Sequence, residues 1–292
     1  MGGRRKDPSI DAVVVASPTE DHAAQVVAAS LAGKDILCEK PVASDLESAL
    51  RAVRAAREAG VLLHVGFQRR HDAAFAGLRD EVLAGRIGEP WLVRICSRDL
   101  EPPPAHFEGA CGGLFVDMAI HDFDMARFVL GQEVVEISSY ARVLVADRGE
   151  ADADADVAIT TLVFESGALG VIENCRQSSP GYDQRVEIHG RAGTLSVDNQ
   201  PRHGLVHADS AGSHRQAWPH FFADRYTTAY AAELDAFVAE VRHRRGGPAP
   251  AGPPGVAATG DDAVRALELS FAADRSARQR QPVVLPLDRS LE

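Results

Sequence analysis

The sequence predicts a parallel α/β unit followed by a larger, mostly antiparallel α+β unit with an open sheet. In the first third of the chain, short apolar segments alternate with helical segments of about 10–15 residues, the pattern of strands joined by helical crossovers. After about residue 90, strand-like segments follow one another directly, and tight turns such as Ser166-Gly167 join several of them. This change of pattern predicts two units with different sheets.

The first unit is expected to contain three strands and two helices. The run Asp11–Ala16, apolar after its first residue, ends at Ser17-Pro18 and is typical of a strand buried on both faces. Ser44 and Glu47 have the spacing of a capping box that opens a helix. The expected elements after the first strand are a helix at 20–31, a strand at 34–39, a helix at 44–59 and a strand at 61–65.

The second unit is expected to be built mainly from strands. A helix near residues 115–130 interrupts them, and two further helices, 229–244 and 260–278, precede a short final strand. The Gly- and Pro-rich stretch 246–255 predicts a loop, and the Ala-Asp repeat 151–156 predicts a solvated turn, with a cation site as its alternative. The expected strands are 91–98, 134–145, 157–164, 168–174, 185–188 and 194–197.

Composition limits the classes of function. The 292 residues include 31 Lys and Arg against 42 Asp and Glu, a formal net charge of −11 that argues against nucleic acid or an anionic membrane as partner. No apolar run approaches the ~18 residues of a membrane span, and the N-terminal segment lacks the apolar core of a secretory signal. The cysteines form no CxxC pair, which predicts free thiols and a cytoplasmic protein; they are Cys38, Cys96, Cys111 and Cys175.

Two strand ends are candidate ligand sites, because ligands of open parallel sheets bind beyond the carboxyl ends of the strands. The segment Ser17–His22 follows the first strand at a helix N-terminus, whose free amides favour polar or anionic ligands. Lys40 follows the second strand and is fixed by Pro41. Its ammonium could polarise a carbonyl or stabilise a developing alkoxide, and the alternative is a surface lysine at a strand end.

Asp117 and His121 lie four residues apart in the predicted helix near 115–130, so they are expected to share a face and to touch. Apolar residues surround this helix and leave no solvated face for either group, and buried charges must be paired or functional. A carboxylate beside a histidine raises its basicity and makes it a candidate general base. A structural Asp–His pair and a metal site that includes Asp124 remain open, whereas the absence of GxSxG argues against a nucleophilic triad.

Further motifs follow in a fixed order. A Ser-Pro strand end with His22 is followed by Glu39-Lys40-Pro41, by residues 66–70 (Gly-Phe-Gln-Arg-Arg) and by Gly112-Gly113 leading to Asp117 and His121. This order resembles the glucose–fructose oxidoreductase, inositol dehydrogenase and rhizopine catabolism (Gfo/Idh/MocA) family. Within that family the inositol 2-dehydrogenases are the most similar, on Arg98-Asp99 with Pro102–Pro104, 113–115, 120–128, 181–187, 220–222 and 225–226.

The resemblance implies NAD-linked oxidation of a secondary alcohol on a cyclitol or sugar, such as myo-inositol to its 2-keto form, by a homo-oligomer that is usually a tetramer. It implies a Rossmann domain for NAD, or alternatively NADP, over residues 1–67, and a domain for substrate binding and oligomerisation over 68–292. Lys40, Asp117 and His121 match the catalytic residues, with His121 as the base. No metal is implied; the substrate-binding matches are Tyr182 and Arg69, and the cofactor-side matches are Ser17, Pro18, His22, Glu39, Lys40 and Gln68.

One departure from the family concerns phosphate binding. Family members begin with a strand and a GxGxxG turn that cradles the pyrophosphate, and no GxGxxG occurs in this sequence. We therefore expect that a first βαβ unit of about 60 residues is missing ahead of residue 11. Two alternatives remain: a non-catalytic homologue that acts through oligomerisation, and a sister dehydrogenase for another sugar or for scyllo-inositol.

Overall fold

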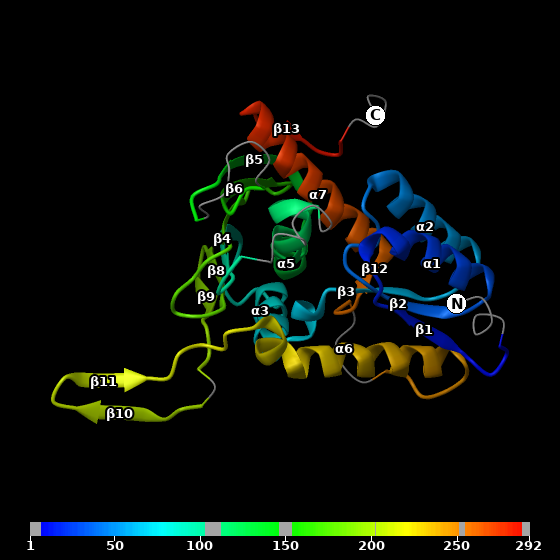
Figure 1. Cartoon of the computed structure of the whole chain (residues 1–292), viewed down its shortest axis with the longest axis horizontal. Helices are drawn as coiled ribbons and strands as arrows, with labels where there is room; N and C mark the ends of the chain where they lie inside the picture. The colour runs from blue at the N-terminus through cyan, green and yellow to red at the C-terminus, as the bar shows by residue number, and fades with distance from the viewer. Residues whose placement is uncertain (1–6, 103–111, 146–153, 202, 251–254, 288–292) are drawn as a thin grey trace.

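The computed structural model describes residues 7–102, 112–145, 154–201, 203–250 and 255–287 (Figure 1). Four sequence predictions fall wholly or partly outside these ranges. They concern Cys111, the prolines 103 and 104, residues 151–153 of the Ala-Asp repeat, and residues 251–254 of the Gly- and Pro-rich loop.

The smaller of the two main sheets has the strand order β1-β2-β3-β12. β1 (Ala12–Val15), β2 (Asp35–Glu39) and β3 (Leu63–Gly66) are parallel to one another. The prediction of a parallel sheet is therefore confirmed. β12 (Ala258–Thr259) pairs antiparallel with β3, so the sheet also uses a strand from the far end of the chain.

Helices cover both faces of this sheet. α1 (Thr19–Leu31) and α2 (Leu46–Glu58) connect the parallel strands and lie on one face, whereas α6 (Phe222–Arg244) crosses the other (Figure 1). Phe237 and Val241 of α6 pack there with Leu37 of β2. Because α6 and β12 come from residues beyond 67, the second predicted domain contributes directly to the first sheet.

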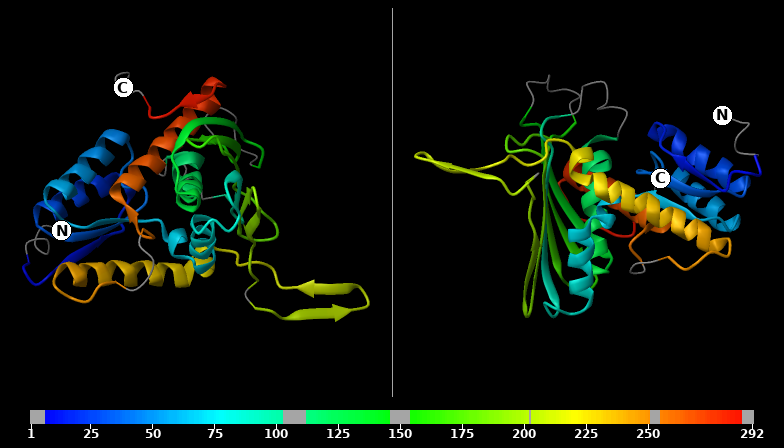
Figure 2. Two further views of the ribbon diagram at one scale, coloured as in Figure 1. Left: turned by 180° about the vertical axis from the view of Figure 1, so that it is seen from behind. Right: turned by 90° about the horizontal axis from the view of Figure 1, so that it is seen from below.

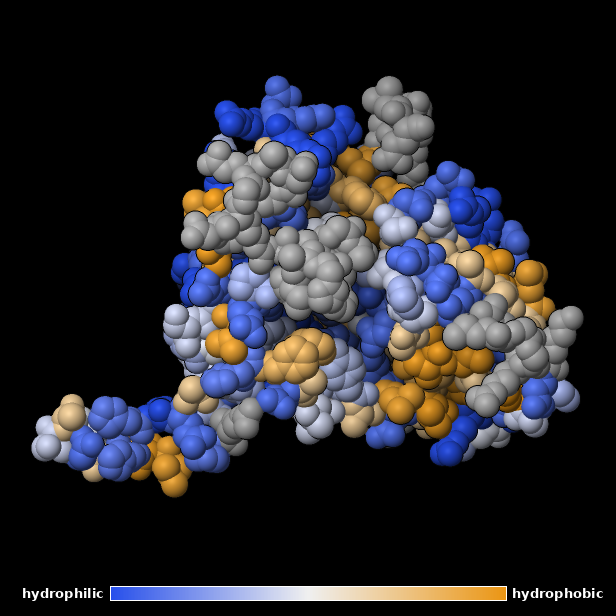
Figure 3. All heavy atoms as spheres, in the orientation of Figure 1, coloured by the Kyte–Doolittle hydropathy of each residue, from blue (hydrophilic) through white to orange (hydrophobic). Residues whose placement is uncertain are grey.

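The position of β1 differs from the prediction of a strand buried on both faces. In the described sheet β1 pairs only with β2, and the Val14 side chain is 58% exposed while Val15 is buried. Apolar side chains gather over this edge of the molecule in Figure 3. The apolar run predicted a strand correctly, but an apolar run does not distinguish a central strand from an edge strand.

The larger sheet is mostly antiparallel, as predicted. Its strand order is β13-β5-β6-β7-β4-β8-β9, and β4 with β7 is its single parallel pair. The strands are β4 (Pro90–Arg98), β5 (Val134–Arg142), β6 (Val157–Phe164), β7 (Leu169–Cys175), β8 (Asp183–Gly190), β9 (Gly193–Val197) and β13 (Val283–Val284).

Three helices cover one face of the larger sheet. They are α3 (Ala73–Leu83), α5 (Ile120–Leu130) and α7 (Gly260–Gln279), and Figure 2 shows them on the same side. α7 also contacts α2 and β3, so one hydrophobic core continues from the small sheet to the large one. No described helix covers the opposite face, on which exposed apolar side chains include Leu92, Tyr140, Ile159 and Leu169.

Two turns differ in detail from the prediction. Asp45, rather than Ser44, is the N-cap residue of α2, and its carboxylate accepts a hydrogen bond from the Ser48 amide at 2.7 Å. Asp156 of the predicted solvated turn is buried, and its carboxylate accepts hydrogen bonds from the backbone amides of Leu144 and Val145 at 2.7 and 2.8 Å. Both carboxylates satisfy backbone amides that a turn would otherwise leave free.

Several elements were not predicted from the sequence. They are α3, β12, the first turns of α6 and the hairpin of β10 (Val206–Asp209) and β11 (Gly212–Arg215), which extends away from the body (Figure 1). The described cysteines Cys38, Cys96 and Cys175 are free thiols, as predicted. In the part of the chain that the structure describes, no helix has the length and hydrophobicity needed to cross a bilayer.

Candidate active site

A cavity of about 910 Å³ lies where the carboxyl end of β2 and the segment after β3 meet the larger sheet. Its volume is within the usual range of small-molecule sites. Seven of the residues singled out from the sequence line it together, although they come from distant parts of the chain. They are Glu39, Lys40, Gln68, Arg69, Asp117, His121 and Tyr182.

Lys40 points into the cavity from the end of β2. Its Nζ donates to the main-chain oxygen of Asp117 at 2.6 Å and lies 3.3 Å from Asp117 Oδ1. The alternative of a solvated surface lysine is therefore wrong. An ammonium has three N–H donors, so one remains for a ligand after these two contacts.

The predicted contact between Asp117 and His121 is not formed. Asp117 lies in a π-helical turn, Phe115–Ala119, which precedes α5, and its carboxylate contacts Lys40 and, at 3.1 Å, Arg176 Nη1. No hydrogen bond joins Asp117 to His121, although both lie in the described ranges. The wider π turn changes the angle between these positions, so the α-helical four-residue rule does not apply.

His121 is buried, and its Nδ1 has no hydrogen-bond partner. Its ring packs edge-on against Phe67 at a centroid distance of 5.7 Å. Burial, together with the cations Arg69 and Lys40, lowers the pKa of His121 well below its usual value. The expectation that a carboxylate raises its basicity was therefore wrong. The imidazole is neutral at pH 7 and already carries a nitrogen lone pair that can accept a proton.

The Asp117 carboxylate is ionised. Burial favours the neutral carboxyl, but Lys40 and Arg176 outweigh it and hold the pKa of Asp117 below its usual value. An ionised carboxylate only accepts hydrogen bonds. Asp117 can therefore bind a substrate hydroxyl as an acceptor but cannot supply a proton.

Arg69 is a buried residue whose charge is already paired. Its Nη1 donates to Asp122 Oδ1 at 2.7 Å, and its Nη2 donates to the Tyr182 hydroxyl at 3.2 Å. Asn174 donates to the second Asp122 oxygen at 2.7 Å. Burial raises the pKa of Tyr182 well above its usual value, so its hydroxyl stays protonated at the cavity wall.

The two carboxylates of the metal alternative have other partners. Both Asp124 oxygens accept from Arg70, at 2.6 and 2.8 Å, in a buried pair. Asp117 is occupied by Lys40 and Arg176. Across the described ranges, no group of three or more metal-ligating side chains is arranged to hold an ion.

Among the cofactor-side residues that follow β1, His22 contacts main-chain oxygens. The two ring nitrogens of His22 lie 2.8 Å from the main-chain oxygens of Ser17 and Pro41, and the ring is buried. His22 thus connects the end of β1 to the end of β2. Ser17 and Pro18 do not line the cavity, and the cofactor roles of these three residues stay predictions.

Sequence reasoning did not assign functions to several cavity residues. Arg176 follows β7 at its carboxyl end, and Asp99 follows β4; burial raises the pKa of Asp99 to about 6, although Arg176 opposes the shift. Both follow the carboxyl ends of a parallel pair of strands, but the rule for parallel sheets was not applied to them because this sheet was predicted to be mostly antiparallel. The remaining wall is mainly apolar and aromatic, and it includes Pro102, Met118, Phe221, Phe222 and Tyr230.

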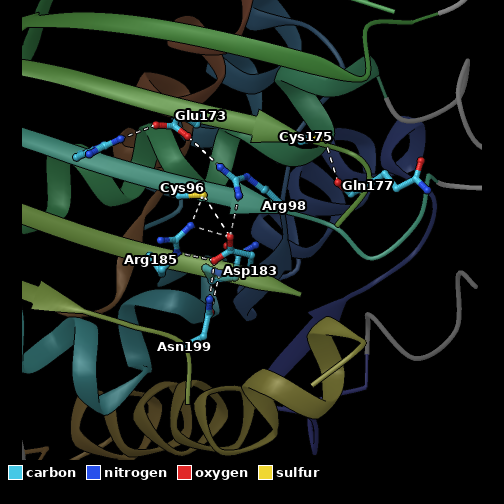
Figure 4. Close-up of polar contacts among 10 residues, drawn as sticks. Cys96, Arg98, Glu173, Cys175, Gln177, Asp183, Arg185 and Asn199 are labelled. Carbon is cyan, nitrogen blue, oxygen red and sulfur yellow. Dashed lines mark hydrogen bonds and ion pairs between the residues drawn. The ribbon is translucent and has the colours of Figure 1, made fainter. Parts of the chain in front are cut away.

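A network of charged side chains lies on the uncovered face of the large sheet (Figure 4). It includes Arg98 and Asp183, which are next in sequence to the cavity residues Asp99 and Tyr182. The Asp183 carboxylate accepts from Arg185 at 2.7 and 2.9 Å and from Arg98 at 3.3 Å. Because side chains alternate along a strand, this network faces away from the cavity. It ties β4 to β8 next to Asp99 and Tyr182, which line the cavity.

Comparisons with known proteins agree with this fold and identify its family. Residues 5–67 match the model of an oxidoreductase family with an NAD-binding Rossmann fold, and residues 75–196 match the Gfo/Idh/MocA C-terminal domain. The chain is 40% identical to the myo-inositol 2-dehydrogenase of Thermotoga maritima, over 96% of this chain and 81% of that protein. It is 39% identical to the inositol 2-dehydrogenase of Rhizobium meliloti, over 94% of this chain and 80% of that protein.

A solved structure is also similar. The myo-inositol dehydrogenase of Lactobacillus casei, crystallised with NAD(H) and myo-inositol, superposes with a TM-score of 0.85 at 27% identity. The match covers 98% of this chain and 80% of the other. The mixed fold of a parallel sheet followed by a large, mostly antiparallel sheet is thus shared with a solved dehydrogenase.

Proposed function

This chain belongs to the Gfo/Idh/MocA oxidoreductase family, and from that membership we propose that it oxidises a secondary alcohol of a cyclitol, with myo-inositol as substrate and NAD as hydride acceptor. The observation that carries the proposal is the buried, neutral His121, whose Nδ1 has no partner, in the same cavity as Lys40. A proton acceptor and an ammonium beside it are the two groups that alcohol oxidation requires.

The cavity fits the nicotinamide end of the cofactor. Gln68 is buried, and its Oε1 has no hydrogen-bond partner, which leaves an acceptor for an amide or hydroxyl group. Glu39 lies at the same wall beside Lys40. We assign Gln68, Glu39 and Lys40 to the nicotinamide and its ribose, and when bound the nicotinamide supplies the acceptor for the hydride.

The other steps of the reaction are proton transfer, stabilisation of the developing charge and substrate binding, and each is assigned to particular residues. His121 takes the hydroxyl proton as the carbon–hydrogen bond breaks, and the carbon becomes a carbonyl. The free N–H of Lys40 stabilises the negative charge that develops on the substrate oxygen. Asp117 accepts a hydrogen bond from a substrate hydroxyl, and Tyr182, held by Arg69, donates or accepts one at the wall.

The charges of the cavity favour a neutral polyol over a sugar acid or phosphate. Arg69 is paired with Asp122, and Arg176 is paired with Asp117. Lys40 is the third cation among the described lining residues, and it too contacts Asp117.

The proposal is tested by following reduced nicotinamide with NAD and myo-inositol, in parallel with scyllo-inositol, glucose and NADP. We expect activity that is highest with an inositol. Calorimetry with NAD alone tests the cofactor separately. Failure of the chain to bind NAD at millimolar concentration, or binding without oxidation of any cyclitol or sugar, would refute the proposal and favour the non-catalytic alternative.

We also propose that the protein is a cytoplasmic homo-oligomer, a tetramer by family resemblance. The uncovered face of the larger sheet supports this, because Tyr140, Ile159 and Leu169 are more than half exposed on it. Exposed apolar side chains gathered on one uncovered sheet face favour an interface there. Light scattering tests the assembly, and Ile159→Glu should lower the measured mass; a monomeric wild type contradicts the proposal.

A further inference from the structure

Arg176 is a buried cation that the proposed chemistry does not use. It follows β7 directly, and its side chain is 7% exposed. Its Nη1 lies 3.1 Å from Asp117 Oδ2 and 3.9 Å from Asp99 Oδ2, and its Nη2 lies 3.8 Å from Asp154 Oδ2. One guanidinium thus faces three carboxylates, which come from the π turn and from the ends of two different strands.

The contact with Asp117 complements that of Lys40. Lys40 binds the Oδ1 side of the carboxylate, and Arg176 binds the Oδ2 side. Two cations on opposite oxygens leave the carboxylate little freedom to rotate. Because each oxygen keeps a lone pair, Asp117 can still accept a hydrogen bond from a ligand in a fixed direction.

Arg176 also reaches the start of the helical segment that carries Asp117. Asp154 accepts a hydrogen bond from the backbone amide of Leu114. Burial raises the pKa of Asp154 above its usual value, and Arg176 and this hydrogen bond oppose the rise. The approach is close, because a Cβ on Gly113 would lie 2.7 Å from Asp154 Oδ1. Gly113 also has a φ of +77°, which favours glycine. Arg176 therefore faces both the π turn and the residue that caps it.

We propose that Arg176 is a positioning residue for the alcohol oxidation, which fixes the ionised Asp117 carboxylate against Lys40 in the orientation that binds the substrate hydroxyl. This rests on the proposed function. It adds a role for a residue that touches Asp117 but takes no part in proton transfer. It also implies that substrate affinity and the acidic limit of activity both depend on the Asp117 carboxylate being ionised and held by Arg176.

The charged groups around Asp117 determine in which direction its pKa changes when Arg176 is removed. Lys40 reaches it from the end of β2 and Arg176 from the end of β7, while Asp99 and Asp154 face the same guanidinium and His121 follows on α5. Among the described residues, removing Arg176 leaves Lys40 as the cation that opposes burial and the neighbouring carboxylate Asp99. The pKa of Asp117 then rises, and the ionised form is lost at a higher pH than in the wild type.

The test compares Arg176→Met with Arg176→Lys. In the methionine variant we expect kcat/KM for myo-inositol to fall at least about tenfold, mainly through KM, and the acid limb of the pH profile to move up by about one unit. The lysine variant keeps the charge but not the guanidinium fork, so its acid limb should stay near that of the wild type while KM remains raised. A wild-type KM in either folded variant overturns the proposal.

A readout without turnover separates this inference from the proposed function. With ¹³C-labelled aspartate, the carboxyl resonance assigned by its loss in Asp117→Asn should titrate at higher pH in Arg176→Met than in the wild type. The same comparison in an Asp99→Asn background removes the other aspartate among the described residues that line the cavity. If the wild type is inactive but the shift is seen, only the proposed function fails; an unchanged midpoint overturns the role of Arg176.

Discussion

Replacement of His121 by asparagine is the most direct test of the proposed chemistry. Asparagine keeps a polar group in the cavity but cannot accept a proton from the substrate hydroxyl. A positioned general base contributes about 10²–10⁴-fold, so kcat/KM should fall by that factor, which corresponds to about 2.7–5.5 kcal/mol. Lys40 and Asp117 remain in place in the variant, and they account for the residual activity that we expect.

The fold should tolerate this change. The ring of His121 makes an edge-on contact with Phe67, and losing such a contact costs about 0.5–1.5 kcal/mol. His121→Asn should therefore stay folded and bind NAD with wild-type affinity. Because the pKa of His121 lies well below its usual value, the wild-type rate should be insensitive to pH around neutrality. In the variant the rate should rise with pH, as hydroxide replaces the missing base.

The assay follows steady-state reduction of NAD across pH, with thermal melting and NAD calorimetry on the same samples. His64→Asn is the matched control. His64 is another buried histidine with a pKa lowered by burial, but it lies 3.1 Å from Glu240 and does not line the cavity. A His121→Asn enzyme with wild-type kcat/KM, or a His64→Asn enzyme that loses as much activity, would refute the role of His121 as the base.

Three further predictions concern charge. Lys40→Met should lower kcat/KM by about 10²–10³-fold, since one stabilising donor to the developing oxyanion is lost, and a variant within threefold of wild type would contradict this. Arg70→Met should cost about 3–5 kcal/mol in urea unfolding because it strands the buried Asp124 carboxylate, and Arg70→Met/Asp124→Leu should recover much of that loss; equal stability of the single and double variants would argue against a stranded charge. Burial, with a contribution from Glu39, raises the pKa of Glu233 from its usual 4.5 to about 8. The unfolded state therefore releases this proton first, and stability falls as pH rises from 4.5 to 8. Glu233→Gln should remove that slope and be more stable than wild type at pH 8 by about 2–4 kcal/mol, and parallel pH–stability curves would contradict the assignment.

Regular periodicity made most of the fold predictable. The segment 157–164 is rich in Val, Ile, Thr and Phe, which favour strands, and β6 occupies the same residues with Ala158, Thr160 and Leu162 buried. α3 was missed although a signal was present. Phe75, Leu78 and Val82 recur at helical spacing behind the N-cap Asp72, and these three are its buried apolar residues. The hairpin β10–β11 carries no such pattern, because all of its residues are exposed.

The members of the site were more predictable than their partners. Strand ends and motif order pointed to Lys40, Asp117 and His121, and all three line one cavity. The four-residue spacing predicted a contact between Asp117 and His121 that is not formed. Nothing in the sequence marks the π turn that orients Asp117 toward Arg176. Which acid pairs with which arginine depends on contacts between residues far apart in the chain, and a local pattern carries no such information.

The two-residue strand β12 has a consequence for the order of events during synthesis. It pairs with β3, whose residues leave the ribosome more than 190 positions earlier. At about 5–20 residues per second, the outer edge of β3 waits about 10–40 s for its partner. Until then the nascent sheet presents an open edge on which other chains can polymerise. The late synthesis of β12 therefore governs how safely β3 folds, and slow translation of the residues between them should increase the demand for chaperones.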